Sequence, residues 1–269
     1  MSSSGLQAAF AHVLVDRKLR DRLSEQGEAL RARFDLTGEE LEKLLELSPS
    51  RLGVTATTVG AKRVDFLVRA LPRTSTIFGG SCQCQLMGFV EASMPFEPSD
   101  GNQVNRLVAE GQRFIEYLET RPAGAPTYAV DLANYELLHL KLNYASDAVR
   151  PPEGEVVIAG DAPLQLGRHV ALGEFGHDVV SLIEAPELPK AAAPAHAFVA
   201  LVKSAPRKIV PYRIGPAVFR MLESWRAPAT LSEVRAALSA QLGPSVEPGV
   251  DAAARFALQE GILVTVAKD

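Results

Sequence analysis

The sequence has few cysteines, no long apolar run and no excess of one charge sign. Its 269 residues include two cysteines, which are too few for the disulfide scaffold of a small secreted protein. No apolar run approaches the roughly 18 residues that a membrane-spanning helix needs. The formal net charge is −4, so a general electrostatic affinity for nucleic acid is not expected. The N-terminus lacks the charged and apolar regions of a signal peptide, and we expect a soluble, cytosolic protein.

Helical periodicity dominates the part of the chain before Arg150-Pro151-Pro152. Thr37 and Glu40 have the spacing of a capping box, and apolar residues recur behind them at helical intervals. The clearest helical pattern covers Asp131–Tyr144, with Leu132, Tyr135, Leu138 and Leu142 on one face. Hydrophobic residues make up 47% of the chain, enough for a sizeable core. We therefore predict a helical domain over residues 1–149.

The pattern after Arg150 mixes strands and helices. Residues 155–159, 168–175, 198–202 and 208–214 are strand-like, and a turn at Ser204-Ala205-Pro206 separates the last two. Three helical segments follow Gly215, and residues 262–266 close the chain as a strand. A β-β-α-α-α-β order is typical of a small winged-helix unit. The prediction is an α+β fold whose second domain, residues 150–269, is winged-helix-like.

This second part resembles a known peptide-binding module. The stretches IVPYRIGPAVFRMLESW, PATLSEVRAALSAQL and DAAARFALQEGILV are similar to the precursor recognition element of ribosomally synthesised, post-translationally modified peptides. The same small fold occurs in the pyrroloquinoline-quinone chaperone family. The resemblance implies that a leader peptide adds as a strand beside Lys208–Arg213, over a groove formed with the third helix. Backbone hydrogen bonds then supply affinity, and alternate side-chain pockets supply specificity.

The first part carries a second resemblance. The stretches LQAAFAHVLVDRKLRDRL, FDLTGEELEKLLEL, KRVDFLVRALPRT and VDLANYELLHLKL are similar to the partner subunits of multinuclear non-heme iron oxidases from the methanobactin and thiaglutamate pathways. In EFGHDVVSLI, Gly176-His177 departs from the aromatic pair usual in that family. The resemblance implies a non-catalytic chain that forms a heterodimer with an iron oxidase and presents a precursor cysteine to it. Iron is then expected in the partner subunit, and no cofactor in this chain.

Residue chemistry favours particular positions for peptide binding. Pro211 has no N–H and fits an edge strand, although a plain edge protected by proline and charge is an equal alternative. Phe256 lies about 140° from the centre of its helix's apolar face and is our preferred anchor for an apolar leader residue. Basic residues at Lys203, Arg207, Lys208 and Arg213 suit an acidic leader. The expected peptide-binding residues are Lys208, Ile209, Val210, Tyr212, Arg213 and Phe256.

Two regions of the helical part are candidates for docking on the oxidase. Arginine is enriched at protein interfaces, and Arg63, Arg69 and Arg73 cluster around Pro72. Tyr135 and His139 lie one helical turn apart in the helix that begins near Asp131. The alternative for both groups is an ordinary solvated face beside a core stripe.

The residues form no recognisable catalytic or metal-binding motif. His169, His177 and Asp178 are the nearest approach to an iron site, but ordinary hydrogen-bonded histidines explain them better. Cys82-Gln83-Cys84 is a lone C-x-C pair, and buried free cysteines are the favoured interpretation. The alternative function is a winged-helix transcription regulator. Its recognition helix, near Leu231–Gln241, carries one arginine and one glutamate, which argues against base readout.

Overall fold

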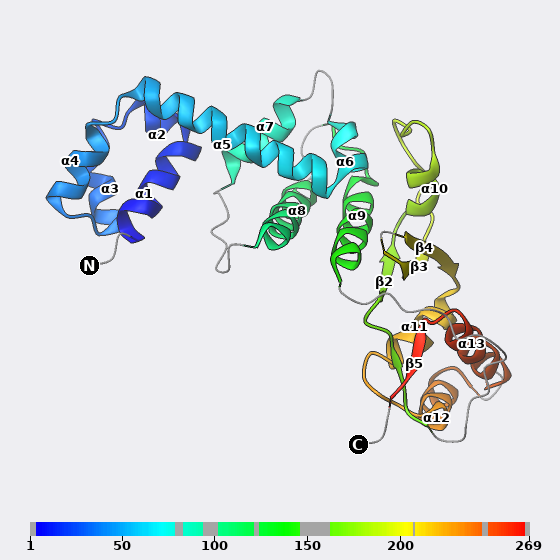
Figure 1. The fold of residues 1–269 in the computed structure, drawn as a ribbon. Coiled ribbons are helices and arrows are strands. Elements are labelled where there is room, and N and C mark those ends of the chain that lie inside the picture. The colour runs from blue at the N-terminus through cyan, green and yellow to red at the C-terminus, as the bar shows by residue number, and fades with distance from the viewer. Residues whose placement is uncertain are drawn as a thin grey trace. The chain divides into compact units, whose positions relative to one another are not determined.

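The computed structural model describes residues 4–78, 83–93, 102–120, 124–145, 162–206, 208–243 and 247–266. It is an α+β structure that divides into two compact units, residues 1–125 and residues 126–269 (Figure 1). The division falls ahead of the expected boundary at residue 150. Helix α9 (Ala129–Tyr144) accounts for the difference, because it packs against the sheet of the second unit.

The described part of the first unit is helical. Its elements are α1 (Ser4–Val15), α2 (Arg17–Asp21), α3 (Gly27–Phe34), α4 (Gly38–Leu45), α5 (Pro49–Ala70), α6 (Pro72–Ile77), α7 (Gln83–Ala92) and α8 (Gln103–Glu119). The long helix α5 packs against α7 and α8. The rings of Phe78 and Phe89 meet Phe114 edge-on, with centroids 5.7 and 5.2 Å away.

Local capping explains where these helices begin. The expected capping box is present, since Glu40 N donates to Thr37 Oγ1 and Thr37 N donates to Glu40 Oε2. Pro49 occupies the first turn of α5, behind the cap of Ser48. Pro72 likewise opens α6. Proline lacks only an N–H that the first turn leaves unpaired, so it is tolerated there.

The second unit combines α9 with two small antiparallel sheets. Its other elements are β1 (Leu164–Leu166), β2 (Val170–Phe175), α10 (Val179–Glu184), β3 (Ala197–Ala205), β4 (Lys208–Ile214), α11 (Pro216–Ser224), α12 (Leu231–Leu242), α13 (Glu247–Gln259) and β5 (Leu263–Thr265). One sheet has the order β2-β3-β4, and β1 pairs with β5 in the other. The strands expected at residues 198–202 and 208–214 correspond to β3 and β4. The strand expected at residues 155–159 lies outside the described residues.

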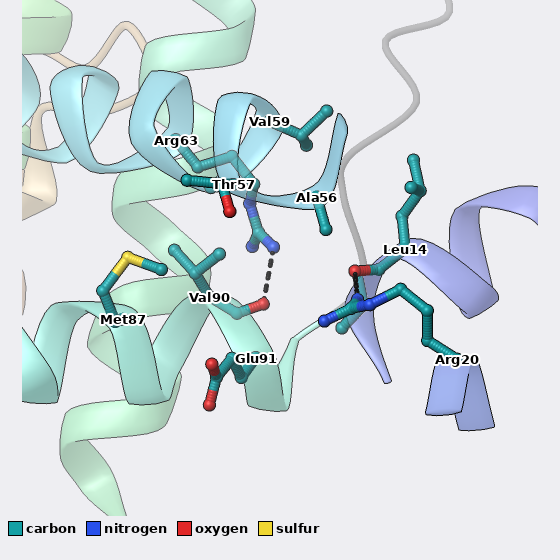
Figure 2. A pocket seen from close by; sticks show the side chains of 11 residues that line it. Leu14, Arg20, Ala56, Thr57, Val59, Arg63, Met87, Val90 and Glu91 are labelled. Carbon is teal, nitrogen blue, oxygen red and sulfur yellow. Dashed lines mark hydrogen bonds between the residues drawn. The ribbon is translucent and has the colours of Figure 1, made fainter. Parts of the chain in front are cut away.

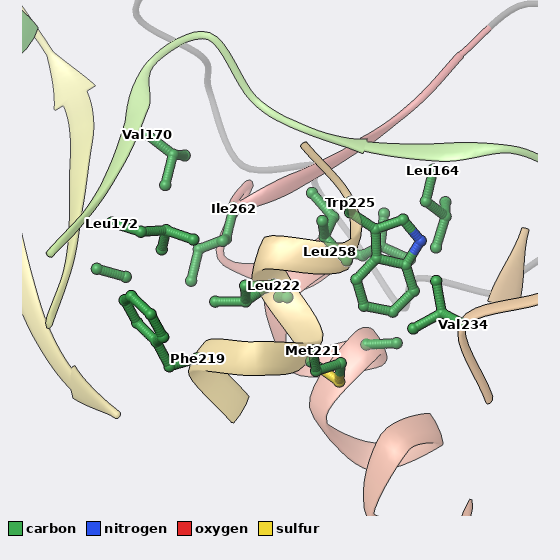
Figure 3. Packing of buried hydrophobic residues seen from close by; sticks show 14 of the residues in the cluster. Leu164, Val170, Leu172, Phe219, Met221, Leu222, Trp225, Val234, Leu258 and Ile262 are labelled. Carbon is green, nitrogen blue, oxygen red and sulfur yellow. The ribbon is translucent and has the colours of Figure 1, made fainter. Parts of the chain in front are cut away.

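Helices cover both faces of the three-stranded sheet. Phe175, Val199 and Leu201 pack with α9 and α10 on one face. Leu172, Ala200 and Val202, which alternate with them, pack with α11, α12 and α13 on the other. Figure 3 shows this second core, in which Trp225 is fully buried beside Leu222 and Leu258. The indole Nε1 of Trp225 donates to the carbonyl of Ala229 at 3.1 Å.

Across the described ranges, no helix combines the length and apolar character that crossing a bilayer requires.

Candidate functional site

Strand β4 has one open edge. It pairs with β3 through Val210 opposite Val202, Pro211 opposite Leu201, and Tyr212 opposite Ala200. No strand among the described residues pairs with its other side. An open edge offers backbone donors and acceptors to an added strand.

The ladder fixes which groups of β4 point to that open edge. Lys203 N donates to the His169 carbonyl beyond β2, so Lys203 and Leu201 direct their backbone groups toward β2. Pro211, opposite Leu201, therefore turns its nitrogen away from β3, where the missing N–H costs nothing. The same alternation directs the N–H groups of Ile209 and Arg213 outward. Two donors thus flank a proline along the open edge.

The side chains of β4 alternate between the two helical layers. Tyr212 and Ile214 pack against the core that includes α13, whereas Ile209 packs against the core that includes α9 and α10. Lys208 and Val210 share the alternating row of Tyr212, on the α13 face. The five expected peptide-binding residues of β4 thus lie at one edge but on two faces.

Phe256 and Tyr212 form an aromatic pair between α13 and β4. Phe256 is 46% exposed, consistent with its position off the apolar face of α13. Its ring lies 6.2 Å from that of Tyr212 at an interplanar angle of 78°. This is the edge-to-face geometry that aromatic quadrupoles favour. A large apolar surface therefore stands beside the open edge.

Glu260, which the sequence did not single out, completes this contact. Tyr212 Oη donates to Glu260 Oε2 at 2.7 Å. Burial of the phenol, and then the hydrogen bond to the Glu260 carboxylate, raise the pKa of Tyr212 to about 12. Glu260 lies four residues after Phe256, so helical spacing was the available signal.

The basic residues expected near the peptide have different environments. Lys208 is exposed and forms no ion pair with any residue that the structure describes. Arg213 is held at α10, where Nη2 donates to Ser181 Oγ at 2.8 Å and lies 3.4 Å from Asp178 Oδ1. Lys203 is buried and donates to the carbonyls of Asn143 and Ala145 at the end of α9, which corrects its expected exposure. Arg207 lies outside the described residues.

Arg63 is not on the surface expected for docking, because it is 5% exposed. Its Nε lies 2.6 Å from Glu110 Oε1, and its Nη1 donates to the carbonyls of Val90 and Ser93. Arg63 lines a cavity of about 60 Å³. Figure 2 shows the lining side chains, with Arg20 donating to the Leu14 carbonyl nearby. Burial with a compensating carboxylate makes Arg63 a structural residue of the first unit.

The other expected docking residues differ in exposure. Arg69 is exposed and pairs with Asp65 at 3.0 Å, and Arg73 is half-buried in α6. Tyr135 is 4% exposed, with its ring 6.0 Å from that of Phe175, so the expectation that it meets a partner is corrected. Burial raises the pKa of Tyr135. His139, one turn later, is exposed, and desolvation lowers its pKa.

The structure does not bring His169, His177 and Asp178 together. His169 is buried, with Nε2 2.5 Å from the Gly261 carbonyl, whereas Asp178 caps α10. His177 Nδ1 lies 2.6 Å from Asp131 Oδ2 and Nε2 lies 3.2 Å from Thr127 Oγ1. A carboxylate only accepts, so Nδ1 carries the hydrogen. These contacts are hydrogen bonds within the fold.

No group of three or more His, Cys, Asp or Glu residues suited to a metal ion occurs within the described part of the chain. Cys82 lies outside the described residues, and Cys84 lies in α7.

The expected recognition helix of a DNA-binding protein corresponds to α12. Its single arginine, Arg235, lies 2.6 Å from Asp251 Oδ1 of α13. An arginine held by a carboxylate of its own chain is poorly placed to read a base edge.

No protein-family model matches the chain, and the search of curated proteins found no match.

Proposed function

We propose that this chain is a non-catalytic partner protein that binds the leader of a ribosomally synthesised precursor peptide. It presents the peptide's cysteine to a multinuclear non-heme iron oxidase with which it forms a heterodimer. In this proposal the second unit contains a winged-helix-like precursor recognition element, formed by β3, β4, α11–α13 and β5. The iron belongs to the partner subunit.

The open edge of β4 beside Phe256 is the observation that carries the proposal. Outward N–H groups at Ile209 and Arg213 offer hydrogen bonds to an incoming strand, while Tyr212 and Phe256 offer apolar contact area. Such an arrangement supports recognition of an extended peptide. A small-molecule substrate instead requires a concave pocket lined by converging polar groups.

Binding of the leader raises the local concentration of the precursor cysteine at the oxidase. Two binding events joined by a linker act as one intramolecular step, so modest affinity for the leader is sufficient. Docking on the oxidase falls to exposed residues, among which Arg69 and His139 are the remaining candidates. Arg63 and Tyr135 are buried within their own units and are no longer candidates for direct contact.

The experiment first looks beside the gene for this chain for an iron oxidase and a short cysteine-containing peptide, and a peptide encoded there is synthesised with a fluorescent label. We expect binding by fluorescence anisotropy to the intact chain. Phe256→Ala should weaken binding by about 1–3 kcal/mol, as for a buried aromatic anchor, and more than Lys208→Ala. Ile209→Pro should also weaken it, because it removes an outward donor and leaves the β3 ladder paired.

Far-UV circular dichroism first establishes that each variant is folded. Val210→Pro is the positive control for this measurement, because Val210 directs its N–H to β3 and its replacement should disturb the sheet itself. Unchanged affinity in folded Phe256→Ala and Ile209→Pro variants would place the peptide site elsewhere.

A further inference from the structure

The α13 face of β4 has opposite charges at its two ends. Lys208 stands at the start of the strand as an exposed cation without an ion pair in the described part of the chain. The Glu260 carboxylate lies at the Tyr212 end. Four residues of extended chain separate Lys208 from Tyr212, a distance of about 13 Å. Val210 lies between them in the same row.

The opposite face of β4 offers no comparable charge. Its cation, Arg213, lies 3.4 Å from Asp178 Oδ1 and 4.0 Å from Glu184 Oε2. An acidic side chain placed there meets a guanidinium whose charge is already compensated. Electrostatic selection of a bound strand therefore falls to the row of Lys208, Val210 and Tyr212.

We propose, resting on the peptide-binding function above, that this edge selects a peptide with an apolar and an acidic side chain four positions apart. The apolar side chain contacts Tyr212 and Phe256, and the acidic one lies beside Lys208. Neighbouring strands are in register, and side chains of one face recur at every second residue. The peptide residue midway between the apolar and the acidic one lies opposite Val210 and is apolar or small.

Glu260 distinguishes the two ends of this row of side chains. A peptide carboxylate placed at the Tyr212 end meets a like charge, and the shifted register loses the contact with Lys208. Attraction at one end and repulsion at the other thus favour a single register. The acidic residue precedes or follows the apolar one according to whether the peptide runs parallel or antiparallel to β4.

A phage-displayed library of short random peptides, selected on the intact chain, tests the pattern directly. Enriched sequences should carry Asp or Glu four positions from a large apolar residue. For a synthetic labelled peptide of this kind, Lys208→Glu should lower affinity about fivefold or more, and a Glu→Lys change in the peptide should restore binding to that variant. Lys190→Glu, the same charge change in an exposed loop, should leave affinity unchanged.

The outcomes separate this inference from the function on which it rests. If Ile209→Pro weakens binding of the enriched peptides, but these peptides carry no acidic residue, the charge pattern is wrong and strand addition still holds. The same conclusion follows if Lys208→Glu leaves their affinity unchanged. If neither Ile209→Pro nor Phe256→Ala changes the affinity for the enriched peptides, both proposals are wrong. They are also wrong if the selection enriches no peptide.

Discussion

Tyr212 donates a hydrogen bond of 2.7 Å to Glu260, joining the edge strand β4 to the residue that follows α13. Burial of the phenol, together with this hydrogen bond, raises the pKa of Tyr212 from 10.0 to about 12. A raised pKa in the folded state means that the protonated phenol is favoured there. The stabilisation is fully present below pH 10, and it is lost as the pH rises toward 12.

We therefore expect Tyr212 to titrate near pH 12, and Glu260→Gln to move its midpoint toward 10. The amide of the substituted side chain still accepts the hydrogen bond but carries no charge. Near-ultraviolet absorbance of tyrosinate, taken as the difference between the chain and its Tyr212→Phe variant, isolates this group. An identical midpoint with and without the Glu260 carboxylate would contradict the assignment. Tyr144→Phe, at an exposed tyrosine, is the control.

The buried pair of Arg63 and Glu110 should make the first unit sensitive to removal of one partner. Both side chains are almost inaccessible, and Arg63 also lies 5.3 Å over the Phe89 ring. Arg63→Met leaves an uncompensated buried carboxylate and should lower the free energy of unfolding by about 3–5 kcal/mol. Adding Glu110→Leu should restore much of that free energy. Arg69→Met removes an exposed pair and should cost less than about 0.5 kcal/mol. Urea unfolding followed by far-UV circular dichroism compares them. Equal losses of unfolding free energy for Arg63→Met and Arg69→Met would show that the buried pair contributes no more to stability than the exposed pair.

The single tryptophan reports on the core of the second unit. Trp225 is fully buried and contacts the cluster that contains Leu222. Leu222→Ala should lower the unfolding free energy by about 2–5 kcal/mol, because it leaves a cavity. Phe256→Ala, at an exposed position, should cost less than about 1 kcal/mol. Urea unfolding monitored by Trp225 fluorescence measures both. A large loss for Phe256→Ala would make Phe256 a core residue and remove it as a peptide anchor.

Local signals predicted much of the secondary structure. The Thr37 and Glu40 capping box, and the apolar spacing around Trp225, depend on residues close together in the chain. The apolar stripe from Leu6 to Ser24 continues over two helices, α1 and α2. Asp16 accepts from Leu19 N at 3.0 Å and thereby starts a new helix. Asp at an N-cap is a local signal, but it competes with an apolar stripe that continues past it.

The spacing of residues in the sequence does not identify which distant elements pack against each other. The apolar face of α9 shows that the helix is buried, but not that it is buried against β2 rather than against the other helices. Arg63 finds Glu110 47 residues later, and His177 finds Asp131 46 residues earlier. Nothing in KRVDFLVRALPRT distinguishes the buried Arg63 from the exposed Arg69, so a docking surface and a buried ion pair have the same sequence pattern.

The exposure of the candidate docking residues leads to the last prediction. Arg69 in α5 is accessible, whereas Arg63 in the same helix is not. If the helical unit docks on the iron oxidase, Arg69→Glu should weaken the complex without changing the fold, because its present partner is an exposed i,i+4 carboxylate. A lasting interface buries at least about 1,200 Å², so the unaltered subunits should co-elute at micromolar concentration.

Size-exclusion chromatography after co-expression measures this difference. Lys43→Glu in α4, an exposed lysine whose partner Glu39 is likewise four residues away, is the matched control and should co-elute as the unaltered chain does. Arg63→Met is uninformative for docking, because the loss of its buried contacts alters the surface that α5, α7 and α8 build together. Separate elution of the two unaltered subunits would contradict the heterodimer. If the Arg69→Glu variant co-elutes with the oxidase as the unaltered chain does, this face of α5 is not the contact. The surface around His139 is then the remaining candidate.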